Sequence, residues 1–171
     1  MLNKKLLTYN TKGFLKKNKP ERKSTGYHQA ESMGILFSID DISKHEVIKS
    51  LIKDLEHDGK RVTTLAYLPK KKENHEFLFD FFTDKDVSFW GQIKTDKVAE
   101  FVNQAFDYLF YIDLDSNMYM RNIMAMSKAK CRVAPYHEEL RDFSELMVEV
   151  KQAGDLKKVV HEMYRYTKQL S

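Results

Sequence analysis

A chain of 171 residues with 42% hydrophobic and 32% charged side chains has the size and composition of one globular domain, which excludes a disordered protein. No apolar run approaches the roughly 20 residues of a membrane-spanning helix, and the basic N-terminus lacks the apolar segment and cleavage site of a secretion signal. The single cysteine, Cys131, cannot form an internal disulfide, so we expect a cytoplasmic protein.

The net charge of +4 is unevenly distributed along the chain. Residues 1–24 hold eight basic side chains against Glu21 alone, a net charge of +7, which leaves −3 for the remainder. The basic residues are Lys4, Lys5, Lys12, Lys16, Lys17, Lys19, Arg22 and Lys23. The distribution predicts a basic N-terminal arm over residues 1–27 that precedes a mildly acidic domain over residues 28–171.

The domain opens with a strand and a helix. MGILFSI (33–39) is a short apolar run that ends at Asp40 and Asp41, which is typical of a buried strand. Ser43 and Glu46 have the spacing of a capping box, so a helix is predicted to start there. Apolar residues then recur at helical spacing.

Gly59 supplies the stop signal for this helix, and RVTTLAYL (61–68) predicts a second strand. The two strands should be parallel, with a right-handed crossover. Charged residues 69–76 indicate a surface loop, and the aromatic run 77–82 indicates a third strand.

The second half of the chain continues the alternation. It predicts a helix from Thr95, a strand over 107–113, a helix over 117–129, strands over 131–134 and 145–150, and a helix over 155–169. Strands that alternate with helices indicate an α/β fold, here a single Rossmann-like three-layer domain with a mainly parallel sheet. The runs MGILFSI and YLFYI should lie side by side at its centre.

Several polar side chains follow the predicted strands, and in parallel sheets ligand sites form at the carboxyl ends of strands near the switch in strand order. The candidates for a ligand pocket are Asp40, Asp41, Asp113, Asp115 and Ser116.

The pair Asp113 and Asp115 resembles the Asp-x-Asp of phosphatases in which one carboxylate attacks phosphorus and Mg²⁺ bridges the ligands. That chemistry also needs a later acidic pair, and the remaining strand ends, near Ala134 and Val150, offer none. We therefore predict that the two aspartates cap the following helix and hold no metal.

Other catalytic patterns are missing from the sequence. The glycines form neither a Walker loop nor a dinucleotide fingerprint, the six histidines lack ligand-pair spacing, and no serine lies in a nucleophile elbow. Cys131 begins an apolar strand and is expected to be a small buried residue. The sequence thus predicts no catalytic residue, no metal site and no cofactor.

Aromatic residues are concentrated in segment 77–90. They are Phe77, Phe79, Phe81, Phe82, Phe89 and Trp90. Core packing with a covered sheet edge explains such a cluster, and the alternative is an exposed apolar patch for a protein partner.

The basic arm is the strongest functional signal. Lysines interleaved with Tyr9 and Phe14 suit phosphate neutralisation with stacking on bases, which indicates RNA or a ribonucleoprotein as partner. Attachment to a membrane surface is an alternative, although the apolar stripe is poorly phased and Gly13 interrupts it. A third interpretation is a poorly ordered terminus. If the arm binds a polyanion, deletion of residues 1–24 should remove binding and few buried contacts, and should leave the stability of the domain nearly unchanged.

The ordered motifs GILFSIDD, FFTDKDVSFWG, FDYLFYIDL, MSKAKCRVAPY and ELMVEVK follow a basic leader. In this pattern the chain resembles, over nearly its whole length, a family of small uncharacterised bacterial proteins, a domain-of-unknown-function family. The resemblance implies a fold and a bacterial origin, and it implies no activity.

More distantly, FDYLFYIDL followed by IMAMSKAKCRVAPY is similar to the N-terminal half of heptosyltransferase-like GT-B glycosyltransferases. The resemblance places Asp40 or Asp41 near that family's catalytic-base loop. The glycine-aspartate signature before a Thr-Pro pair is missing, as is the C-terminal domain that binds the nucleotide sugar, so shared architecture is implied more than shared catalysis.

These observations favour a non-enzymatic cytoplasmic α/β domain whose basic arm binds a polyanion such as RNA or a ribonucleoprotein. The alternatives are an enzyme-derived or ligand-binding half GT-B-like domain that uses the strand-end carboxylates, and attachment to an anionic membrane surface.

Overall fold

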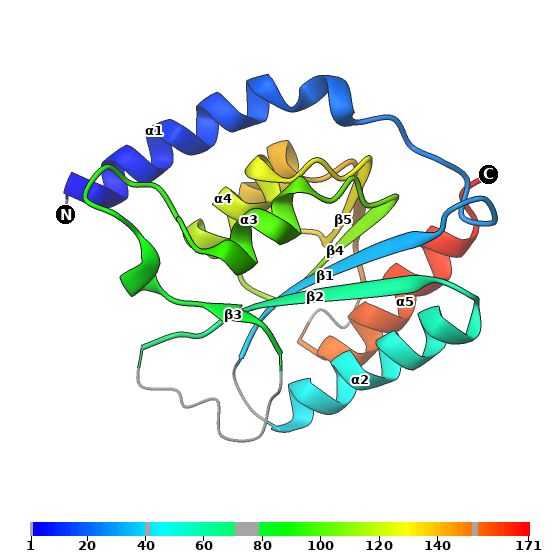
Figure 1. The fold of residues 1–171 in the computed structure, drawn as a ribbon. Helices are drawn as coiled ribbons and strands as arrows, with labels where there is room; N and C mark the ends of the chain where they lie inside the picture. The colour runs from blue at the N-terminus through cyan, green and yellow to red at the C-terminus, as the bar shows by residue number, and fades with distance from the viewer. Residues whose placement is uncertain (1, 40–41, 71–78, 152–153) are drawn as a thin grey trace.

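The computed structural model describes residues 2–39, 42–70, 79–151 and 154–171 (Figure 1). Within these residues, six strands form one sheet in the order β3-β2-β1-β4-β5-β6, and every neighbouring pair is parallel. The strands are β1 (Ser32–Ser38), β2 (Arg61–Tyr67), β3 (Phe81–Phe82), β4 (Tyr108–Ile112), β5 (Cys131–Pro135) and β6 (Leu146–Val148). The predicted α/β Rossmann-like fold with a parallel sheet is confirmed.

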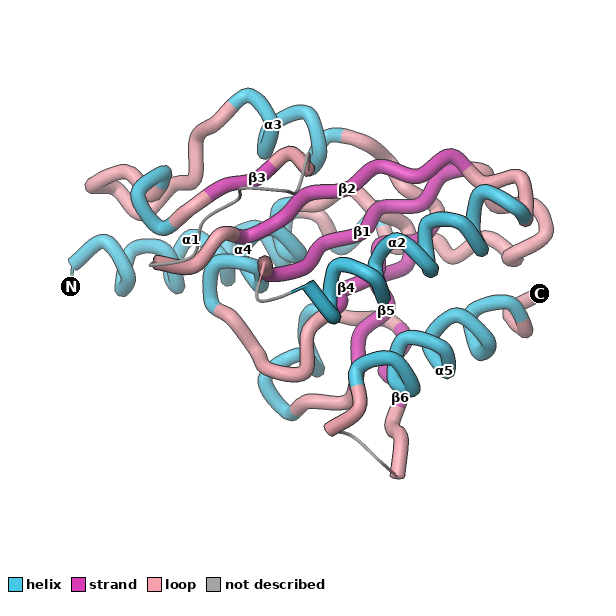
Figure 2. The backbone as a smooth tube through the Cα atoms, turned by 90° about the horizontal axis from the view of Figure 1, so that it is seen from below, coloured by secondary structure: helices cyan, strands magenta, loops and turns pink. Residues whose placement is uncertain are grey.

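Helices cover both faces of the sheet, as Figures 1 and 2 show from two directions. One face carries α1 (Leu2–Lys17), α3 (Asp96–Asn103) and α4 (Met118–Met126), and the other carries α2 (Ile42–His57) and α5 (Leu156–Lys168). The central strands contribute side chains to the hydrophobic cores on both faces of the sheet, because Ile35 and Phe37 pack toward α2 and α5 while Leu36 packs on the opposite side.

The runs MGILFSI and YLFYI lie side by side at the centre of the sheet, as predicted, with Met33 opposite Tyr108 and Phe37 opposite Ile112. All five residues of β4 are buried. Burial on both faces explains why these strands read as continuous apolar runs and lack an alternating pattern.

The predicted helix boundaries are mostly confirmed. Thr95 caps α3, since its side chain accepts the Val98 backbone N–H, and Gly59 ends α2 with a φ of 77°. The capping box at Ser43 is wrong, because α2 begins at Ile42 and Ser43 lies inside its first turn. Asp40 and Asp41 lie outside the described residues.

The predicted strand over 77–82 is shorter in the structure. Among the described residues 79–82, only Phe81–Phe82 form a strand, and they pair with Ala66 and Tyr67 of β2 at the sheet edge. Residues 77 and 78 lie outside the described residues, as does most of the loop predicted over 69–76.

The N-terminal segment forms a helix that packs on α4, so the expectation of few buried contacts is wrong. Leu7, Thr11 and Asn18 are buried on one side of α1 and its extension. Asn122 Nδ2 of α4 donates to Thr11 Oγ1 over 2.8 Å, and Asn18 Nδ2 donates to the carbonyl of Ala125 over 2.9 Å. Because two of the three buried residues are polar, hydrophobic periodicity did not reveal this face.

The residues after α1 connect the two helical layers. Arg22 Nη1 donates to the carbonyls of Ser127 (2.7 Å) and Ala129 (2.5 Å) on the α1 side of the sheet. Five residues later, Tyr27 OH donates to Asp58 Oδ2 over 2.6 Å, next to α2 and α5. The division of the chain at residue 27 stays a prediction.

Leu7 offers a direct test of this packing. Leu7→Ala should lower the free energy of unfolding by about 3 kcal/mol, because it removes a fully buried side chain and leaves a cavity. Urea unfolding followed by circular dichroism measures the loss. Leu2→Ala is the matched control, since Leu2 is 55% exposed on the same helix, and it should change stability by less than about 0.5 kcal/mol. Equal effects of the two substitutions would show that α1 does not pack as described.

Asp107 predicts an acid-sensitive contribution to stability. Burial alone would raise its pKa, but Lys130 (2.7 Å) and the backbone N–H groups of Glu31 and Ser32 outweigh burial and lower the pKa to about 2. Since this folded-state pKa lies below that of an unfolded aspartate, the contribution is present above about pH 4 and is lost as the pH falls toward 2.

Asp107→Asn should therefore cost about 2 kcal/mol of unfolding free energy near neutral pH, and the difference from the parent protein should shrink in acid. Urea unfolding at about pH 7 and about pH 3 measures both differences. A gap that does not change with pH would argue against the charged interaction.

Candidate functional site

The strand order reverses between β1 and β4. The chain passes from β1 through α2 to β2 on one side, and from β4 through α4 to β5 on the other. In parallel sheets this switch point opens a crevice at the carboxyl ends of the two strands. Ser38 ends β1 and Asp113 directly follows β4, so both lie at the switch point.

A buried lysine joins these two residues. Lys44 Nζ lies 3.2 Å from Asp113 Oδ2 and donates to Ser38 Oγ over 2.8 Å, while the Ser38 hydroxyl donates to Asp113 Oδ2. The side chains of Lys44 and Asp113 are only 7% and 14% exposed. The sequence interpretation missed Lys44, although its register with Ile48 and Leu51 on the buried face of α2 was a signal for it.

The side chains of Asp113 and Asp115 have different partners, although the Asp115 backbone N–H donates to Asp113 Oδ1 over 3.4 Å. Asp113 pairs with Lys44, whereas Asp115 is exposed, and its backbone carbonyl accepts the Tyr111 hydroxyl over 2.7 Å. The prediction that the aspartates cap α4 is wrong, because the Asn117 side chain accepts the first backbone N–H groups of that helix. An amide oxygen two residues nearer to the helix fills the cap position.

The predicted metal-free character of this region stays a prediction. In the described part of the chain, no three His, Cys, Asp or Glu side chains are grouped closely enough to hold a metal ion. The ammonium group of Lys44 lies beside the Asp113 carboxylate, in the position that a bound metal cation would take.

A groove of about 850 Å³ lies beside the Ser38–Lys44–Asp113 cluster, between α2 and α5. Among the predicted pocket residues, Asp113 and Asp115 line it, joined by Lys44, Asp155 and His161. Ser116 is half-buried outside this lining.

Cys131 is buried in the sheet, and burial raises the pKa of its thiol to about 12, which suits packing and not nucleophilic chemistry.

The basic residues of the N-terminal segment form a second candidate site. Seven of the eight predicted side chains are exposed, namely Lys4, Lys5, Lys12, Lys16, Lys17, Lys19 and Lys23. Among the described residues, none of these seven makes an ion pair. Arg22 differs, because its side chain is 8% exposed and binds backbone carbonyls.

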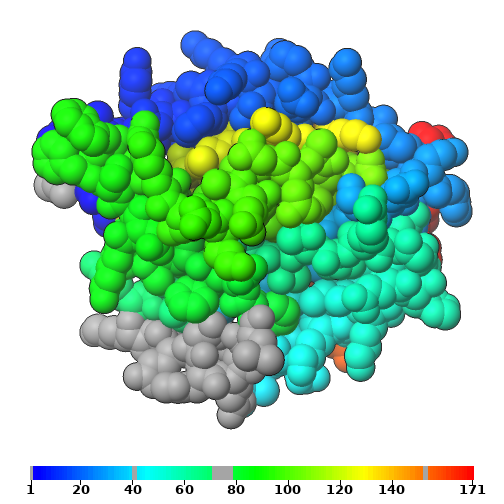
Figure 3. Space-filling model, in the orientation of Figure 1, coloured from blue at the N-terminus to red at the C-terminus, as the bar shows by residue number. Residues whose placement is uncertain are grey.

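Lys5, Tyr9, Lys12 and Lys16 share one face of α1, which we call the α1 lysine face. Their spacing of i, i+4, i+7 and i+11 places them in one row, and all four are exposed. The row lies opposite the buried residues Leu7 and Thr11, so the helix presents it outward. Figure 3 shows α1 along the upper surface of the molecule.

The aromatic segment divides between core and surface. Phe82 is buried and Phe79 packs against the core, as core packing predicted, while Phe77 lies outside the described residues. Phe89 and Trp90 are 65% and 69% exposed, as an apolar patch predicted. Core packing therefore holds for Phe82 and Phe79, whereas Phe89 and Trp90 are exposed, and a protein partner for them stays a prediction.

Lys44 provides a test of the switch-point cluster. Lys44→Met should lower the free energy of unfolding by about 3 kcal/mol, because it leaves the Asp113 carboxylate buried without its partner. Thermal and urea unfolding measure the loss, with Lys49→Met on the exposed side of α2 as the control. Adding Asp113→Asn to Lys44→Met should recover part of the stability, and no recovery would contradict the pairing.

Comparison with known proteins places the chain in a family. Residues 3–170 match the model of a family described as "Family of unknown function (DUF6913)", which confirms the resemblance to an uncharacterised family. The comparison with curated proteins found no match. The bacterial origin and the resemblance to GT-B glycosyltransferases stay predictions.

No helix in the described ranges is both long and apolar enough to cross a membrane.

Proposed function

The chain belongs to a family of unknown function, and from its surfaces we propose that it is a cytoplasmic protein that binds RNA, free or in a ribonucleoprotein, through the α1 lysine face. The observation that carries the proposal is a row of exposed lysines, which have no ion-pair partner in the described part of the chain, on a helix that the fold holds in place. Unpaired lysines in a row are the arrangement that neutralises successive phosphates.

The dimensions of the helix suit a nucleic-acid strand. Lys5 and Lys16 are eleven residues apart, which corresponds to about 16 Å along α1. A stacked strand places one phosphate about every 3.4 Å, so the face spans about five of them. Lys19 and Lys23 extend the basic surface beyond the end of the helix.

The packing of α1 disfavours attachment to a membrane through this helix. A surface-bound amphipathic helix inserts its apolar side into the lipid. Here that side is occupied, because Leu7 is fully buried and Phe14 and Leu15 are partly buried. The outward face offers lysines and Tyr9, which suit a phosphate backbone with occasional stacking on bases.

Fluorescence anisotropy with a labelled single-stranded RNA tests the proposal. Each phosphate contact releases counterions, so log K should fall with log salt by ~0.7 per contact. With about five contacts, a fourfold rise in salt should weaken binding roughly a hundredfold.

The triple variant Lys5→Ala, Lys12→Ala, Lys16→Ala should flatten the salt slope by about two, the share of three contacts, without unfolding the protein. The control is Lys49→Ala, Lys53→Ala, Lys157→Ala, which removes the same charge from exposed positions on α2 and α5. Equal losses in both variants would indicate a general charge effect and would refute the proposed face. Truncation of residues 1–24 is unsuitable because it would remove the buried Leu7, Thr11 and Asn18.

The switch-point groove supports a second candidate function, the binding of a small polar ligand. The specific observation is that Lys44 and Asp113 form a charge-balanced donor and acceptor pair at the edge of a groove of about 850 Å³. Because the lining also carries Glu46, Asp54, Asp115 and Asp155, a neutral, hydroxyl-rich molecule such as a sugar or nucleoside fits that chemistry better than an anion. Amide NMR spectra titrated with such compounds should show shifts around residues 43–54 and 154–164, and unchanged spectra would remove this candidate.

A further inference from the structure

The most exposed apolar side chains near α1 lie in a tight turn. Ser88 N–H donates to the Gln92 carbonyl over 2.9 Å, and Gly91 N–H donates to the Ser88 carbonyl over 3.0 Å. Between them, the rings of Phe89 and Trp90 meet edge to face with centroids 5.4 Å apart. Both rings are more than three-fifths exposed, so the core does not account for them.

The fold holds this turn firmly against α1. Asn10 Nδ2 donates to the carbonyls of Trp90 (3.0 Å) and Gly91 (2.9 Å). Gly91 is buried with a φ of 66°, and a Cβ there would lie 2.3 Å from the backbone nitrogen of Leu7. Glycine is required at this close approach, and the result is a fixed backbone that presents two free aromatic rings.

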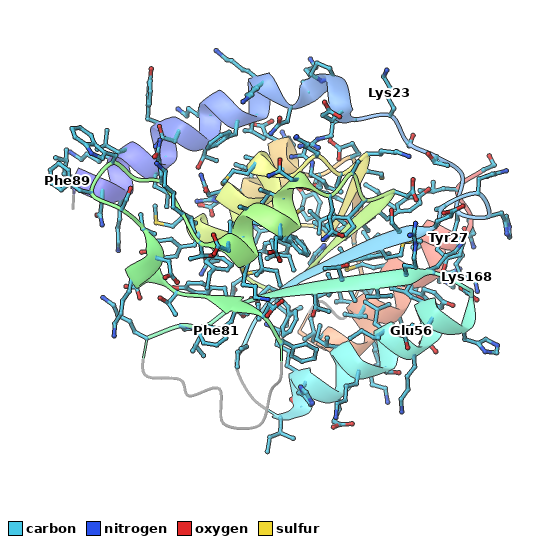
Figure 4. All side chains as sticks on the ribbon, viewed as in Figure 1. Lys23, Tyr27, Glu56, Phe81, Phe89 and Lys168 are labelled. Carbon is cyan, nitrogen blue, oxygen red and sulfur yellow. The ribbon has the colours of Figure 1, made fainter. Side chains whose placement is uncertain are left out.

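The turn lies at one end of the basic surface. Figure 4 shows Phe89 near the N-terminal end of α1 and Lys23 beyond its other end. Tyr9, 76% exposed, adds a third ring on the helix between them. The turn contacts α1 at Leu7 and Asn10, on a flank of the helix outside the lysine row. A strand bound along the row would therefore reach the aromatic rings where it crosses the N-terminal half of the helix, past Tyr9.

We propose that Phe89 and Trp90 form a stacking platform for unpaired bases, which makes the RNA site selective for single strands over duplex. This inference rests on the proposed RNA binding by the α1 lysine face. Aromatic rings stack on any exposed base, and removal of one ring typically weakens binding about tenfold or more. A duplex buries the faces of its bases between neighbouring pairs, so it can use the lysines and not the platform.

Trp90 is the only tryptophan of the chain, so its fluorescence reports directly on the platform. Titration of the full-length protein with single-stranded RNA should quench this emission, whereas a duplex of the same length should bind more weakly and leave it nearly unchanged. Quenching by the duplex to the same extent would overturn the inference.

Substitutions separate stacking from charge. Phe89→Ala and Trp90→Ala should each weaken single-strand binding about tenfold while leaving duplex binding and the salt slope unchanged. Trp90→Phe should retain most of the affinity because it keeps a ring. Phe81→Ala is the matched control, since Phe81 is an exposed aromatic residue on the sheet edge, away from α1, and it should have no effect.

The outcomes distinguish the two proposals. If the protein binds single strands and duplex alike and the ring variants change nothing, the platform is refuted while the lysine face stands. If it binds neither, both proposals are refuted. Vesicles containing anionic phosphatidylglycerol provide the last comparison. If vesicle binding requires Phe89 and Trp90 and RNA binding does not, the rings belong to a lipid-binding surface and the inference is overturned.

Discussion

The arrangement of the basic surface depends on the hydrogen bonds that Asn18 and Arg22 of the N-terminal segment make to the end of α4, which we call the polar seam. The last carbonyl groups of a helix have no partner within it and need donors from elsewhere. Asn18 donates to Ala125 and Met126, and Arg22 donates to Ser127 and Ala129 just beyond the helix end. A segment whose composition predicted a solvated arm is therefore part of the fold, because it supplies hydrogen-bond donors to the carbonyl groups at the end of α4.

This seam also determines which side chains of α1 can meet a ligand. With Leu7 and Thr11 turned toward α4, helical geometry leaves Lys5, Lys12 and Lys16 facing outward. The same docking brings α1 against the turn at Gly91. Lysines on a rigid helix lose less conformational freedom on binding than lysines on a mobile tail, so the packing favours recognition as well as stability.

Lysines of the two helical layers differ in exposure and in ion pairing. On α1 the lysines remain in solvent, and none of the exposed ones has an ion-pair partner among the described residues. On α2, Lys44 lies in the buried row with Ile48, and this is tolerated because Asp113 and Ser38 are within bonding distance of its ammonium group. The partners come from β1 and β4, two strands that are distant in sequence, so only the closed sheet shows why a charged residue occupies that row.

The sequence by itself determined the parallel sheet and its central strands, since burial on both faces requires the continuous apolar runs that β1 and β4 display. It also determined the ends marked by local chemistry, such as the Thr95 cap and the Gly59 stop. Tertiary structure alone decided that residues 2–17 form a packed helix, that Asp113 pairs with Lys44, and that Phe82 is buried while Trp90 is exposed. Caps and the apolar runs of buried strands are patterns of residues close in the chain, whereas these outcomes depend on hydrogen bonds and contacts between residues brought together only when the layers close.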